Sequence, residues 1–149
     1  MENRFETFTM QIAKISRNIR KIKTEEMIEF DLKSPHVSCL YYLYTSGGEL
    51  TAKELCDICA EDKASISRSI DYLESRGYIS CASTAEKRYK SPLFLTDAGR
   101  AVAAATSDKI NNILNLASIG LSDEDRQIFY KSLILISDNL QKICDKYDD

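Results

Sequence analysis

The spacing of apolar residues along this 149-residue chain predicts six helices. In residues 5–22 the apolar side chains recur every three or four positions, which is the period of one face of an α-helix. Residues 129–147 repeat this spacing and form a second continuous apolar seam. Four further periodic segments lie between the two seams, at residues 34–46, 51–60, 62–76 and 96–118.

Residues that cap helices stand at several of the expected boundaries. Thr51 and Glu54 form a capping box, in which each side chain accepts a hydrogen bond from the other residue's backbone N–H. Ser122 and Asp125 have the same spacing at the start of the last helix. Gly77 stands where a left-handed residue is expected to end the fourth helix.

Two short apolar runs interrupt the helical pattern and predict a β-hairpin. Residues 78–81 and 92–95 read as strands, and residues 82–91 form a polar, charged tip between them. The preceding pair of short helices is joined by a tight turn, as in a helix-turn-helix. We therefore expect a mainly α fold with a small β-hairpin wing: a winged helix-turn-helix domain plus terminal helices.

The two long apolar seams exceed what one small domain can bury. Packing the terminal helices of two copies together would bury both seams, and most soluble oligomers are two-fold dimers. The alternative is that the seams pack within one chain. The residues expected at the dimer interface are Phe5, Phe8, Ile12, Ile15, Phe129, Leu133, Ile136, Leu140 and Ile143. The chain then divides into a dimerisation helix with its connector (1–33), a winged helix-turn-helix region (34–99) and C-terminal dimerisation helices (100–149).

Composition and charge narrow the class of protein. Hydrophobic residues make up 44% of the chain and charged residues 29%, which is ordinary for a globular domain. No apolar stretch approaches the roughly 20 residues that span a bilayer, and the N-terminus lacks the layout of a secretory signal. We expect a cytoplasmic protein that makes no contact with a membrane. The net charge of −3 argues against bulk coating of nucleic acid but leaves room for a local basic face.

Cations and small hydroxyl side chains gather where a duplex would meet the helix-turn-helix. The start of the fourth helix can enter the major groove, where such side chains reach base edges and phosphates. The cations of the hairpin tip can reach phosphates or the minor groove. Any one of these residues alone is typical of a protein surface. Their placement together at one helix start and one hairpin tip indicates binding to DNA. The expected DNA-contacting residues are Thr51, Lys63, Ser65, Ser67, Arg68, Lys87, Arg88 and Lys90.

Two motifs resemble those of the MarR family of transcriptional regulators. Residues 65–79, SISRSIDYLESRGYI, resemble its recognition helix, with a Ser-Arg pair, then an apolar residue and Asp, then Leu-Glu, and then a basic residue with Gly. Residues 95–99, LTDAG, resemble its Leu-Thr-x-x-Gly signature after the wing. The order of elements resembles the family over the whole chain. One departure is Glu86, which stands where the family usually has Asp before the wing arginine.

The resemblance implies a function that the residues alone do not specify. Ser67 and Arg68 match positions that contact DNA in the family, and Arg88 matches the arginine of the wing tip. Family members commonly repress transcription as homodimers on pseudo-palindromic operators. Many respond to small lipophilic or phenolic ligands, which implies a pocket lined partly by the first, second and fifth helices. The residues of that pocket remain unassigned.

Other chemistry is poorly supported by the sequence. Cys56 and Cys59 form a C-x-x-C without a second pair, and His36 and Cys39 share a helix face without further ligands. Five cysteines and a single histidine suggest free thiols and leave no catalytic triad. We expect no metal, no cofactor and no enzymatic activity. Two alternatives stay open: a winged-helix module that binds protein, and a thiol- or metal-responsive sensor that binds DNA.

Overall fold

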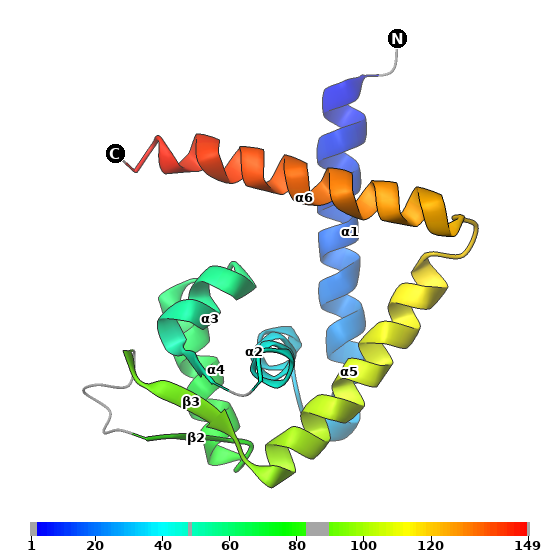
Figure 1. Ribbon diagram of the computed structural model, residues 1–149. Coiled ribbons are helices and arrows are strands. Elements are labelled where there is room, and N and C mark those ends of the chain that lie inside the picture. The colour runs from blue at the N-terminus through cyan, green and yellow to red at the C-terminus, as the bar shows by residue number, and fades with distance from the viewer. Residues whose placement is uncertain (1–2, 48, 83–89, 149) are drawn as a thin grey trace. The chain divides into compact units, whose positions relative to one another are not determined.

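A computed structural model describes residues 3–47, 49–82 and 90–148 of the chain (Figure 1). The helices are α1 (Arg4–Glu26), α2 (Ser34–Thr45), α3 (Ala52–Cys59), α4 (Lys63–Ser75), α5 (Asp97–Ala117) and α6 (Asp123–Asp145). A short 3-10 helix, η1 (Ile28–Phe30), follows α1, and the strands are β1 (Leu50–Thr51), β2 (Ile79–Cys81) and β3 (Pro92–Leu95). The six predicted helices and the predicted mainly α fold with a wing are confirmed.

The helix ends follow from the capping residues that the sequence supplies. At the start of α3 the Thr51 hydroxyl accepts the Glu54 N–H at 3.2 Å, and the Thr51 N–H donates to the Glu54 carboxylate at 2.8 Å. These two bonds satisfy donors that a helix start otherwise leaves without partners. Ser122 caps α6 by accepting the Asp125 N–H at 3.0 Å. Gly77 has a φ of +74°, as the predicted left-handed cap requires.

The core lies between α2, α3, α4 and the small sheet. Figure 1 shows α2 end-on between α1 and the α3–α4 pair. The central side chains are fully buried aliphatic groups that come from all these elements and include Leu40, Leu43, Leu55, Leu73 and Leu93. This packing buries one face of α4 in the core and leaves the opposite face exposed.

The sheet has three antiparallel strands in the order β1-β3-β2, where the sequence predicted a two-stranded hairpin. Leu50 pairs with Leu93, and Ile79 pairs with Leu95. The strand β1 has two residues, which is too short for an alternating pattern to reveal it. It joins the start of the helix-turn-helix to the base of the wing.

Gly99 allows the start of α5 to lie directly against the wing. A Cβ atom at this position would lie 1.8 Å from the backbone oxygen of Tyr78, so no larger residue fits. The Thr96 hydroxyl accepts the Gly99 N–H at 3.0 Å, and the Thr96 N–H donates to the Tyr78 carbonyl at 3.0 Å. The Leu-Thr-x-x-Gly motif therefore has a structural role at this junction.

The chain forms two compact units, Met1–Ile110 and Asn111–Asp149. The helix α5 begins in the first unit and ends in the second. Neither α1 nor α6 contains a buried residue among those described. Within the described ranges, no helix is both long enough and apolar enough to cross a membrane.

Candidate nucleic-acid interface

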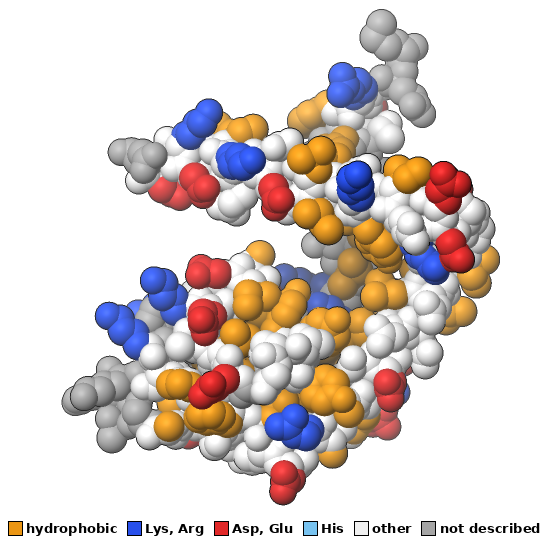
Figure 2. Space-filling model, viewed as in Figure 1, with side chains coloured by type: hydrophobic (Ala, Val, Ile, Leu, Met, Phe, Trp, Pro, Cys, Tyr) orange, Lys and Arg blue, Asp and Glu red, His pale blue; other side chains and the backbone are white. Residues whose placement is uncertain are grey.

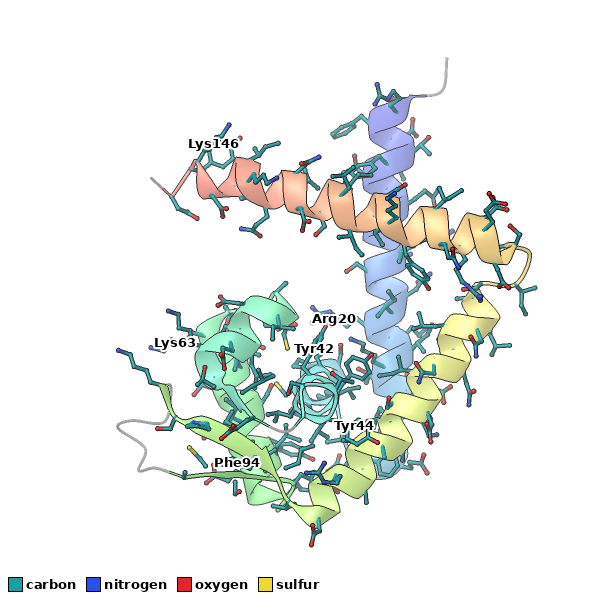
Figure 3. All side chains as sticks on the ribbon, in the orientation of Figure 1. Arg20, Tyr42, Tyr44, Lys63, Phe94 and Lys146 are labelled. Carbon is teal, nitrogen blue, oxygen red and sulfur yellow. The ribbon has the colours of Figure 1, made fainter. Side chains whose placement is uncertain are left out.

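The start of α4 presents side chains that are predicted from the sequence to contact DNA bases. Lys63, Ser67 and Arg68 are exposed, and Lys63 points outward from the first residue of the helix (Figure 3). Ile66 and Ile70 lie on the opposite face and are 1% exposed. The helix therefore separates a buried apolar face from an exposed face that carries cations and a hydroxyl group, the groups that hydrogen-bond to bases and phosphates.

Ser65 has a more internal position than its neighbours. It is half-buried, and its N–H donates to the Asp62 carboxylate at 2.7 Å, which caps α4. Its carbonyl accepts the Ser69 hydroxyl at 2.9 Å. The backbone of Ser65 thus fixes the first turn of the helix, and a contact of its side chain with DNA stays a prediction.

The turn between α3 and α4 is tied to α1. Ala60 takes the left-handed conformation with a φ of 52°, which reverses the chain between the two helices. Arg20 of α1 forms an ion pair with Glu61 in this turn, at 3.4 Å. This ion pair links α1 to the turn that leads into α4.

The C-terminal half of α4 is held by a polar cluster that the sequence did not indicate. The Tyr72 hydroxyl donates to the Asp31 carbonyl at 2.5 Å and lies 3.0 Å from its carboxylate. The ring of Tyr72 stacks on His36, with centroids 4.3 Å apart. Arg76 lies 3.7 Å from the same carboxylate. Because Tyr72 and Asp31 are 41 residues apart, no local pattern could have shown this contact.

The surroundings of His36 favour its neutral form. Burial lowers the pKa of the imidazole, and the charge of Lys33 lowers it further, against a smaller opposing effect of Asp31. Its Nδ1 accepts the Lys33 N–H at 3.0 Å at the start of α2. A protonated Nδ1 could not accept that bond.

The remaining predicted DNA contacts lie at the start of α3 and on the wing. Thr51 is half-buried and serves as the N-cap of α3, where its hydroxyl oxygen accepts the Glu54 N–H. Lys90 is exposed just before β3. Lys87 and Arg88 lie outside the described residues. All four assignments stay predictions.

The residues predicted for dimerisation are largely exposed in the single chain. Phe5 is 77% exposed, and Leu140 of α6 is 48% exposed. Figure 2 shows hydrophobic side chains along the surface of α6. Leu133 is half-buried, and the other members are exposed between 38% and 47%: Phe8, Ile12, Ile15, Phe129, Ile136 and Ile143. The two seams therefore lack a partner within the units described.

A hollow of about 410 Å³ lies in the second unit, lined by Asn111, Leu114, Asn115, Ser118, Arg126 and Tyr130. Its lining comes from the end of α5 and the start of α6, whereas the expected effector pocket involves the first, second and fifth helices. Arg126 is already paired with Asp123 at 2.5 Å. We assign no ligand to this hollow, and the position of an effector pocket stays a prediction.

Comparisons with known proteins agree with this geometry. Residues 30–88 match the sequence profile of the MarR family. That segment extends from the end of η1 into the wing and contains the whole helix-turn-helix. A comparison with curated proteins finds no match.

Solved structures share the fold over nearly the whole chain. A MarR family regulator from Neisseria meningitidis has a TM-score of 0.78 at 21% identity, over 97% of this chain and 98% of its own. A MarR protein from Peptoclostridium difficile reaches 0.83 at 20% identity, over 95% and 92%. MepR from Staphylococcus aureus, solved as a complex with DNA, has a TM-score of 0.77 at 19% identity, over 93% and 99%. At these identities the likeness shows the fold.

Proposed function

We propose that this chain is a DNA-binding transcriptional regulator of the MarR family, whose sequence profile matches residues 30–88, and not an enzyme. In this proposal it acts as a homodimeric repressor on a pseudo-palindromic operator. A small lipophilic or phenolic effector releases it from DNA. The observation that carries the proposal is the exposed face of α4, where Lys63, Ser67 and Arg68 stand at the N-terminal end.

The recognition geometry requires an α4 that is fixed at both ends. The Asp62 cap holds the first turn, and the contact of Tyr72 with Asp31 holds the last turns. A helix anchored in this way can present Arg68 to a guanine edge with little loss of backbone freedom. MepR, which has the same fold, was solved in complex with DNA, and this supports DNA as the partner in the proposal.

Dimerisation supplies the second half of the interface. The exposed seams of α1 and α6 offer apolar area that a second copy can cover. Two-fold pairing would present two α4 helices to half-sites about 34–36 Å apart, which is one turn of DNA. The wing cations, with Lys90 at the described edge of the tip, would add phosphate contacts outside the major groove.

The test is selection of bound sequences from random duplex DNA, followed by affinity measurements on the selected site. Replacing Arg68 by Ala should cost about 1–3 kcal/mol and relax base preference at one position in each half-site. Arg100→Ala is the matched control, because it removes the same charge from an exposed position on α5 outside the predicted DNA contacts.

Salt dependence measures the phosphate contacts of the bound dimer, whereas the ratio of affinities for the selected and an unrelated duplex measures sequence recognition. A dimer that makes six to ten phosphate contacts should lose roughly 10³–10⁵-fold in affinity between 50 and 200 mM salt. Failure to enrich any sequence, or equal affinity of the Arg68→Ala and parent proteins, would contradict the assignment of α4. A dimer that binds no duplex would favour a protein-binding role for the same surface.

A further inference from the structure

An alanine stands at the centre of the exposed face of α4. The buried residues of this helix are Ile66, Ser69, Ile70 and Leu73. At about 3.6 residues per turn, Ala64 points about 170° away from the centre of this buried face, and Arg68 points about 150° away from it. Both residues are exposed and lie in the N-terminal half of the helix. Ala64 is therefore the residue of the first turn that projects most directly outward.

Polar side chains lie beside this alanine. Lys63 and Ser67 are exposed on one flank of the same face, about 70° and 110° from the buried centre. When the second helix of a helix-turn-helix enters the major groove, its N-terminal residues meet the base edges. In the proposed complex the centre of the outer face therefore meets bases, and the flank with Lys63 lies nearer to the phosphate backbone.

The chemistry of alanine restricts what it can contact in a major groove. Its side chain is a methyl group, which neither donates nor accepts a hydrogen bond. Base edges in this groove present donors, acceptors and one apolar group, the C5 methyl of thymine. A methyl group placed over a donor or an acceptor would remove water from that polar group without replacing its hydrogen bond. The thymine methyl is therefore the matching partner for Ala64.

We propose that Ala64 is a specificity-determining residue that packs on the C5 methyl of a thymine in each half-site, near the guanine contacted by Arg68. The inference rests on the proposed function. Ala64 and Arg68 are four residues apart, which is about 6 Å along the helix axis. Successive bases of a strand are about 3.4 Å apart along the duplex. The thymine should therefore lie within about two base pairs of the guanine.

Helix propensity gives a second reason for an alanine at this position, because alanine is the strongest helix former. That role acts within the protein and is the same whichever duplex is bound. A contact with thymine instead depends on a methyl group of the DNA. Changing the DNA while the protein stays intact therefore separates the two roles.

The experiment begins with the duplex selected by the parent protein. The position at which base preference relaxes in Arg68→Ala marks the guanine. The nearby thymine is then replaced by deoxyuridine, which lacks the C5 methyl and keeps the other groups of the base. Parent affinity should fall about fourfold when one half-site is changed and about 15-fold when both are changed. The same replacement outside the half-sites should have no effect.

Ala64→Gly removes the methyl group from the protein side of the contact. This variant should bind the thymine and deoxyuridine duplexes with equal affinity. The matched control is Ala101→Gly, which removes a methyl group from an exposed position on α5 and should keep the full loss seen with the parent. The ratio of affinities for the two duplexes cancels any general effect of glycine on folding.

Three results would overturn the assignment of Ala64. They are selected half-sites without a thymine near the guanine, equal affinity of the parent for the two duplexes, or the same loss in Ala64→Gly as in the parent. With any of these results the selected duplex still supports the proposed function, and only the role of Ala64 is wrong. If selection enriches no duplex, the proposed function fails and this inference fails with it.

Discussion

At the scale of single residues, contacts between distant parts of the chain decide which positions tolerate change. Gly99 touches the backbone of Tyr78 with no room for a methyl group. The ring of His36 stacks on Tyr72, and its Nδ1 accepts a hydrogen bond from the Lys33 N–H at the start of α2. Neither residue takes part in the proposed DNA contacts, so both can be tested through stability.

Replacing Gly99 by Ala should destabilise the fold by about 3 kcal/mol, the upper end of overpacking penalties, because the neighbour is backbone and cannot rotate away. Gly77→Ala is the matched control. Gly77 has a positive φ, and a methyl group added there would meet no atom within 4 Å, so only conformational strain of about 1–2 kcal/mol applies. Urea unfolding of both variants measures the difference, and equal losses would contradict the tight contact.

His36 should make stability depend on pH. Its pKa in the folded protein is lowered from 6.5, so below that pH the unfolded chain binds a proton more readily than the folded chain does. Stability should therefore fall as the pH drops from about 7 through 6.5. His36→Gln cannot titrate, so the difference between parent and variant unfolding curves isolates the effect. A difference that stays constant between pH 7 and 5 would contradict it.

At the scale of elements, contacts at both ends of α4 fix the position of this helix. Asp62 caps the first turn, and Tyr72 with Arg76 anchors the last turn to Asp31. The cap also places a negative charge beside the surface proposed to meet phosphates. Its contribution to helix stability and its effect on DNA affinity should therefore have opposite signs.

Asp62→Asn and Asp62→Ala separate these two roles. Asn keeps a capping oxygen, whereas Ala removes it and should cost about 1 kcal/mol of stability. Asn should bind any duplex more tightly than the parent does, most of all at low salt, because one repulsive charge is gone. Thermal unfolding and DNA titrations at two salt concentrations check both effects. Weaker DNA binding by the Asn variant would argue against α4 facing the duplex.

At the scale of the whole molecule, the exposed apolar surface of α1 and α6 exceeds what either unit covers by itself. None of the described residues in these helices is buried. In the proposed dimer these seams are the interface, and they set how far apart the two α4 helices lie. DNA affinity should therefore depend on residues that never touch DNA.

Leu140→Glu should yield a monomer, because a charge in an apolar interface has no partner. Losing one of two linked binding sites should lower operator affinity by roughly 10²–10⁴-fold. Gln127→Glu adds the same charge to another face of α6 and should leave the dimer intact. Analytical ultracentrifugation and DNA titration measure both variants. A dimeric Leu140→Glu protein would place the interface elsewhere.

The sequence by itself determined the elements of this protein, because helical period, capping boxes and glycine caps act between neighbours in the chain. These local rules predicted the six helices, the helix-turn-helix, the wing and the outward direction of Lys63 and Arg68. Only the tertiary structure decided which distant residues meet. The pairing of Leu50 with Leu93 and the contact of Tyr72 with Asp31 depend on how helices and strands pack. Such contacts produce no periodic pattern in the sequence, because each partner by itself is an ordinary residue of its own helix, strand or loop.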